Sequence, residues 1–351
     1  MRVISGTNVN DVFLRGVDFF NGKDNYRLQD SRNGITREAH GPVTTVYQKP
    51  WQRVLFNSER DANPFFHLYE AIWMLAGSND LRKLVHFNSG MAAFSDDNKT
   101  LNGAYGYRWR HQFDVDQLSL VIDILKKDPD SRRAVLQMWD VIYDLDSSSK
   151  DVPCNTNIYF KIRDEQLHMT VCNRSNDMIW GAYGANVVHM SVLQEYMAAS
   201  LGVGMGKYYQ ISDSFHVYEN EQWEKVKHLE LDPFYWKEWK SHYPEKHYPL
   251  VSKPDIFLKE CVGFLQQIPP RRLTGRPEES NEWPPIIIDD FMNYFFLDVL
   301  IPMVNAYLHH KKRDYDQCYQ YLTQIKAEDW QKACFEWIKR REFAWRKKHE
   351  S

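Results

Sequence analysis

The stretch FFHLYEAIWMLAG, residues 65–77, restricts the fold of this chain more than any other feature of the sequence. Its apolar side chains recur at helical spacing and the pattern ends at Gly77, which predicts a helix. Because apolar groups dominate the pattern, we expect this helix to be buried inside a folded domain. Its one acidic residue, Glu70, is either an ordinary helix-face charge or a functional group inside the protein.

The sequence up to residue 220 alternates helical and extended patterns. Residues 116–127 and 187–201 have helical spacing, and the second pattern stops at Gly202. Strand patterns occupy residues 133–141, 156–163 and 166–172, with the turn Asp164-Glu165 between the last two. This mixture predicts an α/β fold of the α+β type, in which helices pack on a mixed sheet.

The C-terminal third of the chain has a different character. Residues 254–268 have a helical pattern that two prolines end, and a polar loop covers about residues 271–285. Residues 288–345 are typical of two or three helices with a basic end. We therefore divide the chain into a catalytic α/β domain, residues 1–250, and a helical C-terminal extension, residues 251–351.

Charge and cysteine content exclude several classes of protein. The formal net charge is −3, so the chain lacks the overall basic field that binds duplex DNA or an anionic membrane. The five cysteines form no CxxC pair or Cys/His cluster, which argues against a structural zinc site and suits a reduced cytosol. The N-terminus has no apolar signal core, and no run of 18 apolar residues occurs. We expect a cytoplasmic protein that binds no metal, polymeric nucleic acid or membrane.

A candidate catalytic group, the thiol of Cys154, lies in a loop at the start of a predicted strand. A cysteine in such a loop is accessible more often than one inside a helix. Twenty residues further along the chain, Arg174 and Ser175 can grip a phosphate through a guanidinium and a hydroxyl. A nearby guanidinium also lowers the pKa of a thiol, which gives the thiolate that a nucleophile requires.

Each of these groups also has an ordinary structural explanation. A lone cysteine is usually a small buried apolar residue, and Arg174 with Asp177 can form a weak surface ion pair. His216 and Tyr218, which alternation places on one face, fit a half-buried strand. Together with Arg132-Arg133 upstream, however, the thiol, the arginines and the polar groups suit an anionic heteroaromatic ligand. From the residues alone, the chain is a candidate nucleotide enzyme.

Six motifs, in order over about residues 30–220, resemble signatures of the thymidylate synthase superfamily. The longest is similar to R-S-x-D…G…N…H-x-Y and comprises Arg174-Ser175-Asn176-Asp177, Gly181, Asn186 and Ser214-Phe215-His216-Val217-Tyr218. The others are Ser31-Arg32-Asn33-Gly34, the helix of residues 70–77, Tyr105-Gly106-Tyr107-Arg108-Trp109-Arg110, Asp130-Ser131-Arg132-Arg133 and Pro153-Cys154. The resemblance implies a thymidylate synthase-like mixed sheet with packed helices, to which the C-terminal helices are added.

The resemblance also implies a role for each residue at a matching position. In catalysis, Cys154 would attack C6 of the pyrimidine, Glu70 would hold a water for proton transfer, and Tyr105 would assist proton removal from C5. The cofactor would be 5,10-methylenetetrahydrofolate. The implied binding residues are Arg32, Arg174 and Ser175 for the phosphate, His216 and Tyr218 for the sugar, Asn186 for the base, and Asp177 and Trp73 for the cofactor. Arg132 and Arg133 would reach the phosphate in a neighbouring subunit, which implies a homodimer with shared active sites.

Departures from the family pattern bear on the reaction. Asn155 stands where synthases usually have His, Asn173 stands where they usually have Gln, and the C-terminus lacks the short apolar tail that closes over folate. In the common intermediate, an exocyclic methylene at C5, hydride from the folate gives a methyl group and water gives a hydroxymethyl group. A site less able to exclude water favours the second product. The pattern is similar to the nucleotide hydroxymethylases of bacteriophages and antibiotic pathways, which would place a phage-encoded enzyme in the host cytoplasm.

The sequence therefore predicts a deoxypyrimidine monophosphate hydroxymethylase. A thymidylate synthase, or a catalytically silent relative that binds nucleotide, remain alternatives. For the base, the amide of Asn186 can both donate and accept, which matches N3–H and O4 of uracil and favours dUMP over dCMP. Counting from Cys154 puts Ala185 at the base-reading position, whereas counting back from His216 puts Asn186 there, with one residue inserted after Gly181. We favour Asn186, because Ala185 offers no polar group.

Overall fold

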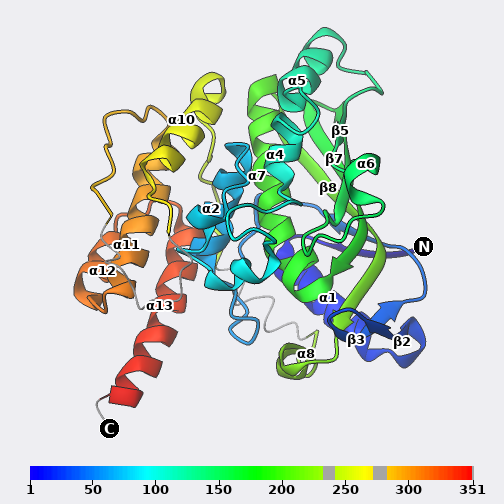
Figure 1. Ribbon diagram of the computed structural model, residues 1–351, viewed down its shortest axis with the longest axis horizontal. Coiled ribbons are helices and arrows are strands. Elements are labelled where there is room, and N and C mark those ends of the chain that lie inside the picture. Colours follow the sequence, from blue (N-terminus) through cyan, green and yellow to red (C-terminus); the bar gives the residue numbers. More distant parts are fainter. Residues whose placement is uncertain (232–241, 272–282, 350–351) are drawn as a thin grey trace.

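The protein, described by a computed structural model for residues 1–231, 242–271 and 283–349, is built on an eight-stranded mixed sheet. The strand order is β1-β4-β8-β7-β6-β5, and the β2–β3 hairpin joins the sheet through β8 (Figure 1). The strands are β1 (Arg2–Gly6), β2 (Tyr26–Ser31), β3 (Gly34–Ala39), β4 (Val43–Tyr47), β5 (Val135–Gln137), β6 (Asn155–Arg163), β7 (Gln166–Asp177) and β8 (Gly204–Tyr218). The predicted mixed sheet with packed helices is confirmed.

The β6–β7 hairpin brings the candidate nucleophile next to its arginine. Its turn residues Asp164 and Glu165 have φ values of +49° and +56°, the left-handed pair that a two-residue type I′ turn requires. The turn sets the antiparallel register from Arg163–Gln166 to Asn157–Cys172, and a β-bulge between Asn155 and Asn157 then puts Asn155 opposite Asn173. Cys154, directly before β6, therefore lies beside Arg174, whose backbone N–H donates to the Cys154 carbonyl at 2.9 Å.

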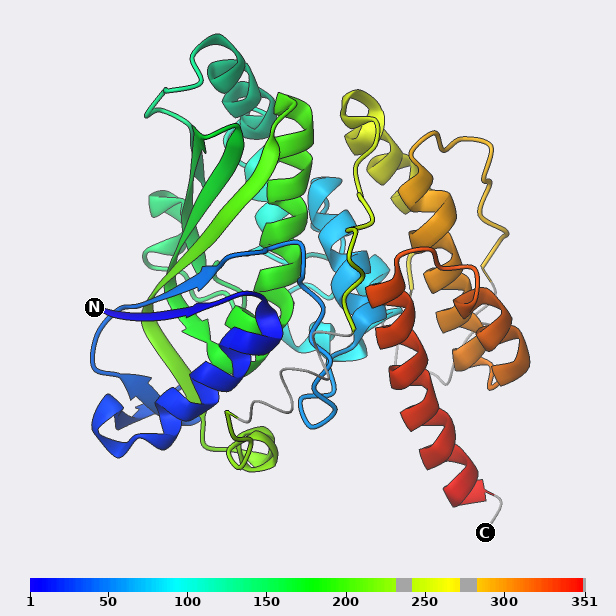
Figure 2. The ribbon, with the colours of Figure 1, turned by 180° about the vertical axis from the view of Figure 1, so that it is seen from behind.

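Helices cover the sheet in two successive layers. Figures 1 and 2 show α7 on the sheet, α2 beside α7, and the C-terminal helices on the far side of α2. The helices are α1 (Val9–Asn21), α2 (Pro64–Leu75), α3 (Leu81–Leu84), α4 (Tyr105–Arg110), α5 (Gln117–Lys127), α6 (Val141–Asp144), α7 (Asn186–Leu201), α8 (Glu221–Val226), α10 (Pro254–Gln267), α11 (Ile301–Lys311), α12 (Tyr315–Leu322) and α13 (Glu328–His349). As predicted, α7 ends at Gly202, whose φ of +69° favours glycine.

The helix predicted from its apolar pattern, α2, lies at the centre of the molecule. All of its residues from Pro64 to Leu75 are buried, including Glu70. Its start follows from local chemistry, because the side chain of Asn63 accepts a hydrogen bond from the Phe66 N–H at 3.1 Å and proline occupies the first helical position.

The C-terminal helices complete the hydrophobic core around α2. The ring of Phe65 lies 5.4 Å from Tyr307 on α11 and 5.5 Å from Trp337 on α13, and Tyr69 lies 6.3 Å from Phe264 on α10. The helices predicted after residue 250 are thus present, whereas most of the predicted loop 271–285 falls outside the described residues. We propose that residues 251–351 are an extension that closes the core rather than an independent module.

One predicted strand is shorter than its pattern indicates. Instead of residues 133–141, β5 spans only Val135–Gln137. The chain leaves the sheet because Asp140 caps the following helix: its carboxylate accepts from the Ile142 N–H at 3.1 Å. This early turn puts α6 and the segment before Cys154 at the rim of the site.

Candidate active site

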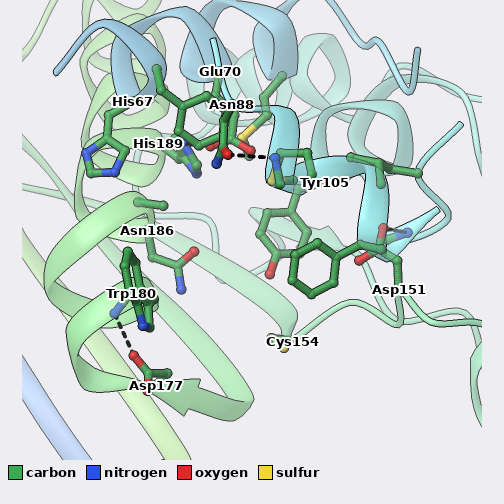
Figure 3. Close-up of a pocket in the computed structure, with 18 of the residues that line it drawn as sticks. His67, Glu70, Asn88, Tyr105, Asp151, Cys154, Asp177, Trp180, Asn186 and His189 are labelled. Atoms are coloured by element: carbon green, nitrogen blue, oxygen red, sulfur yellow. Dashed lines mark hydrogen bonds and ion pairs between the residues drawn. The ribbon is translucent and has the colours of Figure 1, made fainter. Parts of the chain in front are cut away.

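The candidate site is a cavity of about 630 Å³ (Figure 3). Residues of α2, α4 and α7 line it, together with the ends of β7 and β8. Its size is typical of pockets for small organic ligands. Seven of the residues predicted from the sequence line it: Glu70, Trp73, Tyr105, Cys154, Asp177, Asn186 and Tyr218. Side chains that lie up to 148 residues apart in sequence, from Glu70 to Tyr218, thus converge on one space.

The thiol of Cys154 experiences opposing influences. Burial raises its pKa above the usual value, the positive charges of Arg174 and Arg32 lower it, and the carboxylate of Asp151 raises it. Arg174 lies close because its Nε donates to the Pro153 carbonyl and its Nη2 to the Val152 carbonyl, both at 3.0 Å. An anionic ligand bound to these arginines would reduce their effect on the thiol, so the order of binding and activation matters chemically.

Tyr105, the first residue of α4, faces Cys154 across the cavity. Burial raises the pKa of its phenol well above the ordinary value, and the neighbouring Cys154 and Asp151 add to this effect. Hydrogen bonds from the backbone of Asn155 and Cys154 act in the opposite direction. The phenol therefore stays protonated and can donate to, or relay a proton from, a group beside the thiol.

Asp151, which the sequence did not predict, fixes the segment that carries Cys154. Its carboxylate accepts from the Gly103 N–H at 2.7 Å, and its carbonyl accepts from the Asn102 side chain at 3.0 Å. Burial raises the pKa of Asp151. These contacts join the segment before α4 to the segment before β6, so Tyr105 and Cys154 keep a fixed relative position.

The end of the cavity away from Cys154 holds a carboxylate and two histidines (Figure 3). Oε2 of Glu70 lies 2.9 Å from Nε2 of His189 on α7. His67 lines the same region, and its pKa lies well below the usual value because of burial and the nearby Arg60 and His189. His67 is therefore neutral. Both histidines were missed from the sequence, although His189 follows Asn186 by three residues and so shares its helix face.

Asn186 opens α7 with its amide held by a polar chain. Its Nδ2 donates to Oδ1 of Asn176 at 3.1 Å, and Nδ2 of Asn176 donates to Oγ of Ser212 at 2.9 Å. The preceding segment, Met178–Ala185, is a π-helix in which the Asn186 N–H bonds to the Gly181 carbonyl. This wider turn can accommodate an extra residue; both Ala185 and Asn186 line the cavity, so the base-reading role of Asn186 stays a prediction.

Asp177 and Trp180 border the cavity where β7 ends. The Asp177 carboxylate accepts from the Trp180 N–H at 2.5 Å, and burial raises its pKa. The guanidinium of Arg60 stacks on the Trp180 ring at 4.2 Å and donates to the Ile179 carbonyl at 2.8 Å. A flat aromatic wall next to a buried carboxylate suits a heterocycle that carries N–H donors.

The other predicted residues lie outside the cavity lining. Arg32 is exposed between β2 and β3 and donates to the Lys150 carbonyl at 3.3 Å, on the Cys154 side. Ser175 is half-buried on β7. His216 on β8 lies opposite Asp177 in the register of the two strands, and its ring lies 5.3 Å from that of Tyr218. Arg132 and Arg133 are exposed before β5, and in the described part of the chain no side-chain hydrogen bond or ion pair joins them to a cavity residue.

Comparison with known proteins identifies the family of the chain. A family model described as thymidylate synthase matches residues 59–235, which contain Glu70, Tyr105, Cys154 and Asn186. The chain belongs to the thymidylate synthase family. A deoxyuridylate hydroxymethyltransferase of Pseudomonas phage M6 is 44% identical to it over 328 residues, which cover 90% of this chain and 88% of the phage protein.

Other relatives within the thymidylate synthase family match shorter regions. A deoxyuridylate hydroxymethyltransferase of Bacillus phage SP01 is 40% identical over 196 residues, 53% of this chain and 51% of that protein. A putative thymidylate synthase of Methanosarcina mazei is 42% identical over 126 residues, 36% of this chain and 56% of that protein.

Two departures from the family pattern meet across the β6–β7 hairpin. Asn155 and Asn173 are cross-strand partners, and both are buried. Nδ2 of Asn173 donates to the Ile211 carbonyl at 3.1 Å. A change at one position therefore alters the space and polarity available to the other, directly behind Cys154.

No group of three or more His, Cys, Asp or Glu side chains in residues 1–231, 242–271 and 283–349 could hold a metal ion. No helix in these ranges is both long and apolar enough to cross a membrane.

Proposed function

We propose that the chain catalyses the folate-dependent C5 hydroxymethylation of dUMP. The observation that carries this proposal is the cavity itself: a thiol, a buried carboxylate and a fixed amide face one space in a chain that is similar over 90% of its length to a deoxyuridylate hydroxymethyltransferase. A family can host several reactions, so the assignment rests on these groups together with that similarity.

The nucleotide would lie between Cys154 and Asn186. The Cys154 thiolate attacks C6, which makes C5 nucleophilic. Oδ1 of Asn186 accepts from N3–H and its free N–H donates to O4, since its other N–H is already bound to Asn176. Arg32, Arg174 and Ser175 hold the phosphate, and His216 and Tyr218 contact the sugar hydroxyl. Arg174 retains its Nη1 for the phosphate, because its contacts with the backbone use Nε and Nη2.

Trp73, Trp180 and Asp177 would hold the cofactor. Bound 5,10-methylenetetrahydrofolate supplies the one-carbon unit. The residues fit such a molecule, since the cavity lining is mainly apolar and aromatic and the buried Asp177 can accept from the amino group of a pterin. Tyr105 holds and moves the proton that leaves C5, and Glu70 orients water within the site.

We further propose a homodimer with shared sites that works in the cytoplasm. Arg132 and Arg133 are exposed, and the cavity of their own chain does not use them. In a two-fold dimer both could instead contact the phosphate bound by the partner.

Two assays separate this function from its alternatives. Release of tritium from C5 of labelled dUMP in the presence of methylenetetrahydrofolate is expected for both a hydroxymethylase and a synthase. Only the synthase oxidises the cofactor to dihydrofolate, which raises the absorbance. Tritium release without an absorbance rise supports the proposal, and release with it indicates a synthase. Tight nucleotide binding with no release indicates a silent relative.

A further inference from the structure

His189 and Glu70 form a buried pair that no motif predicted. Their side chains are 4% and 10% exposed, and Nε2 of His189 lies 2.9 Å from Oε2 of Glu70. Both residues line the cavity, and His189 shares a face of α7 with Asn186 (Figure 3). The pair therefore borders the same space as the nucleotide base in the proposed complex.

The surroundings leave His189 as the partner of this carboxylate. The ionisable groups that face the pair are His67 from α2, which burial keeps neutral, Arg60 from the segment before α2, and Asp151 from the segment before β6. The contacts of Arg60 are to Trp180 and to the Ile179 carbonyl. A buried carboxylate is oriented by the donor or cation nearest to it, and in this pair that group is His189, whose Nε2 lies 2.9 Å from Oε2 of Glu70.

The proposed reaction needs such a carboxylate at its last step. Water attacks the exocyclic methylene at C5, so a C–O bond forms while the electron pair of the methylene double bond moves into the ring. The ring then restores its C5–C6 double bond, and the C6–S bond breaks to release the Cys154 thiolate. The proton that the water loses requires a base. A hydride transfer to the same carbon would require none.

We propose that His189 is a positioning residue for this water: Nε2 lies 2.9 Å from Oε2 of Glu70, a small reorientation of the ring lets Nε2–H donate to that oxygen when the substrate binds, and Oε1 is left to hold the attacking water and accept its proton. This inference rests on the proposed hydroxymethylase function. It adds a residue on which the choice of water as the final acceptor depends.

The experiment follows the fate of the methylene in the full-length protein. The substitutions are His189→Gln, which keeps an N–H donor, and His189→Leu, which has similar bulk and no donor. His310→Gln, at a buried histidine of α11 outside the cavity, is the matched control. Each protein is given dUMP and methylenetetrahydrofolate, with and without 2-mercaptoethanol. The thiolate competes with water for the methylene and needs no base. Affinity for dUMP alone is measured by calorimetry.

The expected result is a change in product partition. In His189→Leu, hydroxymethylation falls by about 100-fold, in the range of lost general-base catalysis, while added thiol yields the C5 thioether. The dUMP affinity of the variant and the partition in His189→Gln and His310→Gln stay within about threefold of the unmodified protein. Unchanged hydroxymethylation in a folded, dUMP-binding His189→Leu protein overturns the inference, as does an equal loss of both products. A methyl product from the unmodified protein overturns the proposed function and this inference with it.

Discussion

Nε of Arg174 donates to the carbonyl of Pro153 at 3.0 Å, one residue before the candidate nucleophile. The register of the β6–β7 hairpin imposes this contact, because β6 begins directly after Cys154 and Arg174 lies on the opposite strand. The same guanidinium stacks over Trp139 at 5.6 Å. Arg174 therefore stabilises the backbone around Cys154 and lowers the pKa of its thiol at the same time.

Arg174→Gln should make Cys154 less reactive. Burial already raises the pKa of this thiol and Arg174 offsets part of that increase, so removing the charge raises the pKa further and reduces the thiolate fraction at pH 8. We expect alkylation of Cys154 by iodoacetamide to slow by about tenfold. Peptide mass spectrometry measures the rate. Arg163→Gln, at an exposed arginine paired with Asp130, is the control; equal rates in all three proteins would contradict the prediction.

Cys154→Ala should abolish turnover and leave the fold intact. The side chain contributes a nucleophile rather than core packing, because it lies at the cavity wall. Cys172→Ala, which removes another half-buried thiol outside the cavity, should keep activity within about twofold, as expected for a residue remote from the site. C5 tritium release and circular dichroism check the two statements. Measurable release from Cys154→Ala would exclude the thiol mechanism.

Asn186→Asp should shift the substrate preference from dUMP toward dCMP. A carboxyl group matches the amino group and N3 of cytosine, whereas the amide matches uracil. We expect the ratio of kcat/KM for the two nucleotides to change by at least about 100-fold, since unpaired buried polar groups discriminate strongly. In the unmodified protein Oδ1 of Asn176 accepts a hydrogen bond from Nδ2 of Asn186, so the Asn176 side chain must change its hydrogen bonding in the variant. An unchanged ratio would assign base reading to a different residue.

The sequence identified residues that line the cavity better than those that support them. Seven residues at positions that resemble the thymidylate synthase motifs line the cavity, and the role of each stays a prediction. Asp151 and Arg60 gave no such signal, since each reaches the cavity only through tertiary packing, whereas His67 precedes Glu70 by three residues on the predicted helix. His189 had one clue, its position three residues after Asn186 on a predicted helix.

Elements with strong periodicity were predicted well, and the failure at β5 has a local cause. The apolar patterns of α2 and α7 identify buried helices whatever their neighbours. In residues 133–141, by contrast, apolar alternation continues past Gln137. The strand nevertheless ends there, because Asp140 caps the helix that follows. The π-helix before Asn186 was visible only as an ambiguity of one residue in the spacing.

Mixing two inactive variants tests the shared-site dimer. Arg132→Ala removes a phosphate contact from one chain and Cys154→Ala removes the nucleophile from the other. Equal amounts, unfolded and refolded together, should regain about a quarter of the unmodified activity, because half of the random dimers contain one intact site of two. Arg132→Ala mixed with itself is the control. Absence of recovery despite dimer formation would count against shared sites.

The pair Arg53–Glu195 should make stability depend on acid pH. Burial alone raises the pKa of Glu195, but Arg53, His247 and the Leu250 N–H outweigh it and bring the pKa to about 2. Because folding lowers the pKa of this carboxyl group, its ionised form stabilises the fold at pH values above the ordinary pKa of 4.5. This stabilisation is lost as the pH falls toward 2. These contacts also connect α7 with the segment that precedes the C-terminal helices.

Glu195→Gln should therefore lower the free energy of unfolding by about 3 kcal/mol at pH 7, since it leaves the buried Arg53 without its counter-charge. The difference from the unmodified protein should shrink between about pH 5 and pH 3. In this range the unmodified protein begins to lose the stabilisation that the ionised Glu195 provides. Urea unfolding at the three pH values measures it. Glu224→Gln, at an exposed pair with Lys227, is the control and should change stability by less than about 0.5 kcal/mol. A constant difference at all pH values would contradict the assigned pKa.

The most direct test of the central claim is the mass of the product. The purified protein is incubated with methylenetetrahydrofolate and either dUMP or dCMP, and the nucleotides are weighed by mass spectrometry. The account predicts that dUMP gains one CH2O unit and that dCMP reacts far more slowly. A gain of CH2, accompanied by dihydrofolate, would contradict it and establish a methylating synthase.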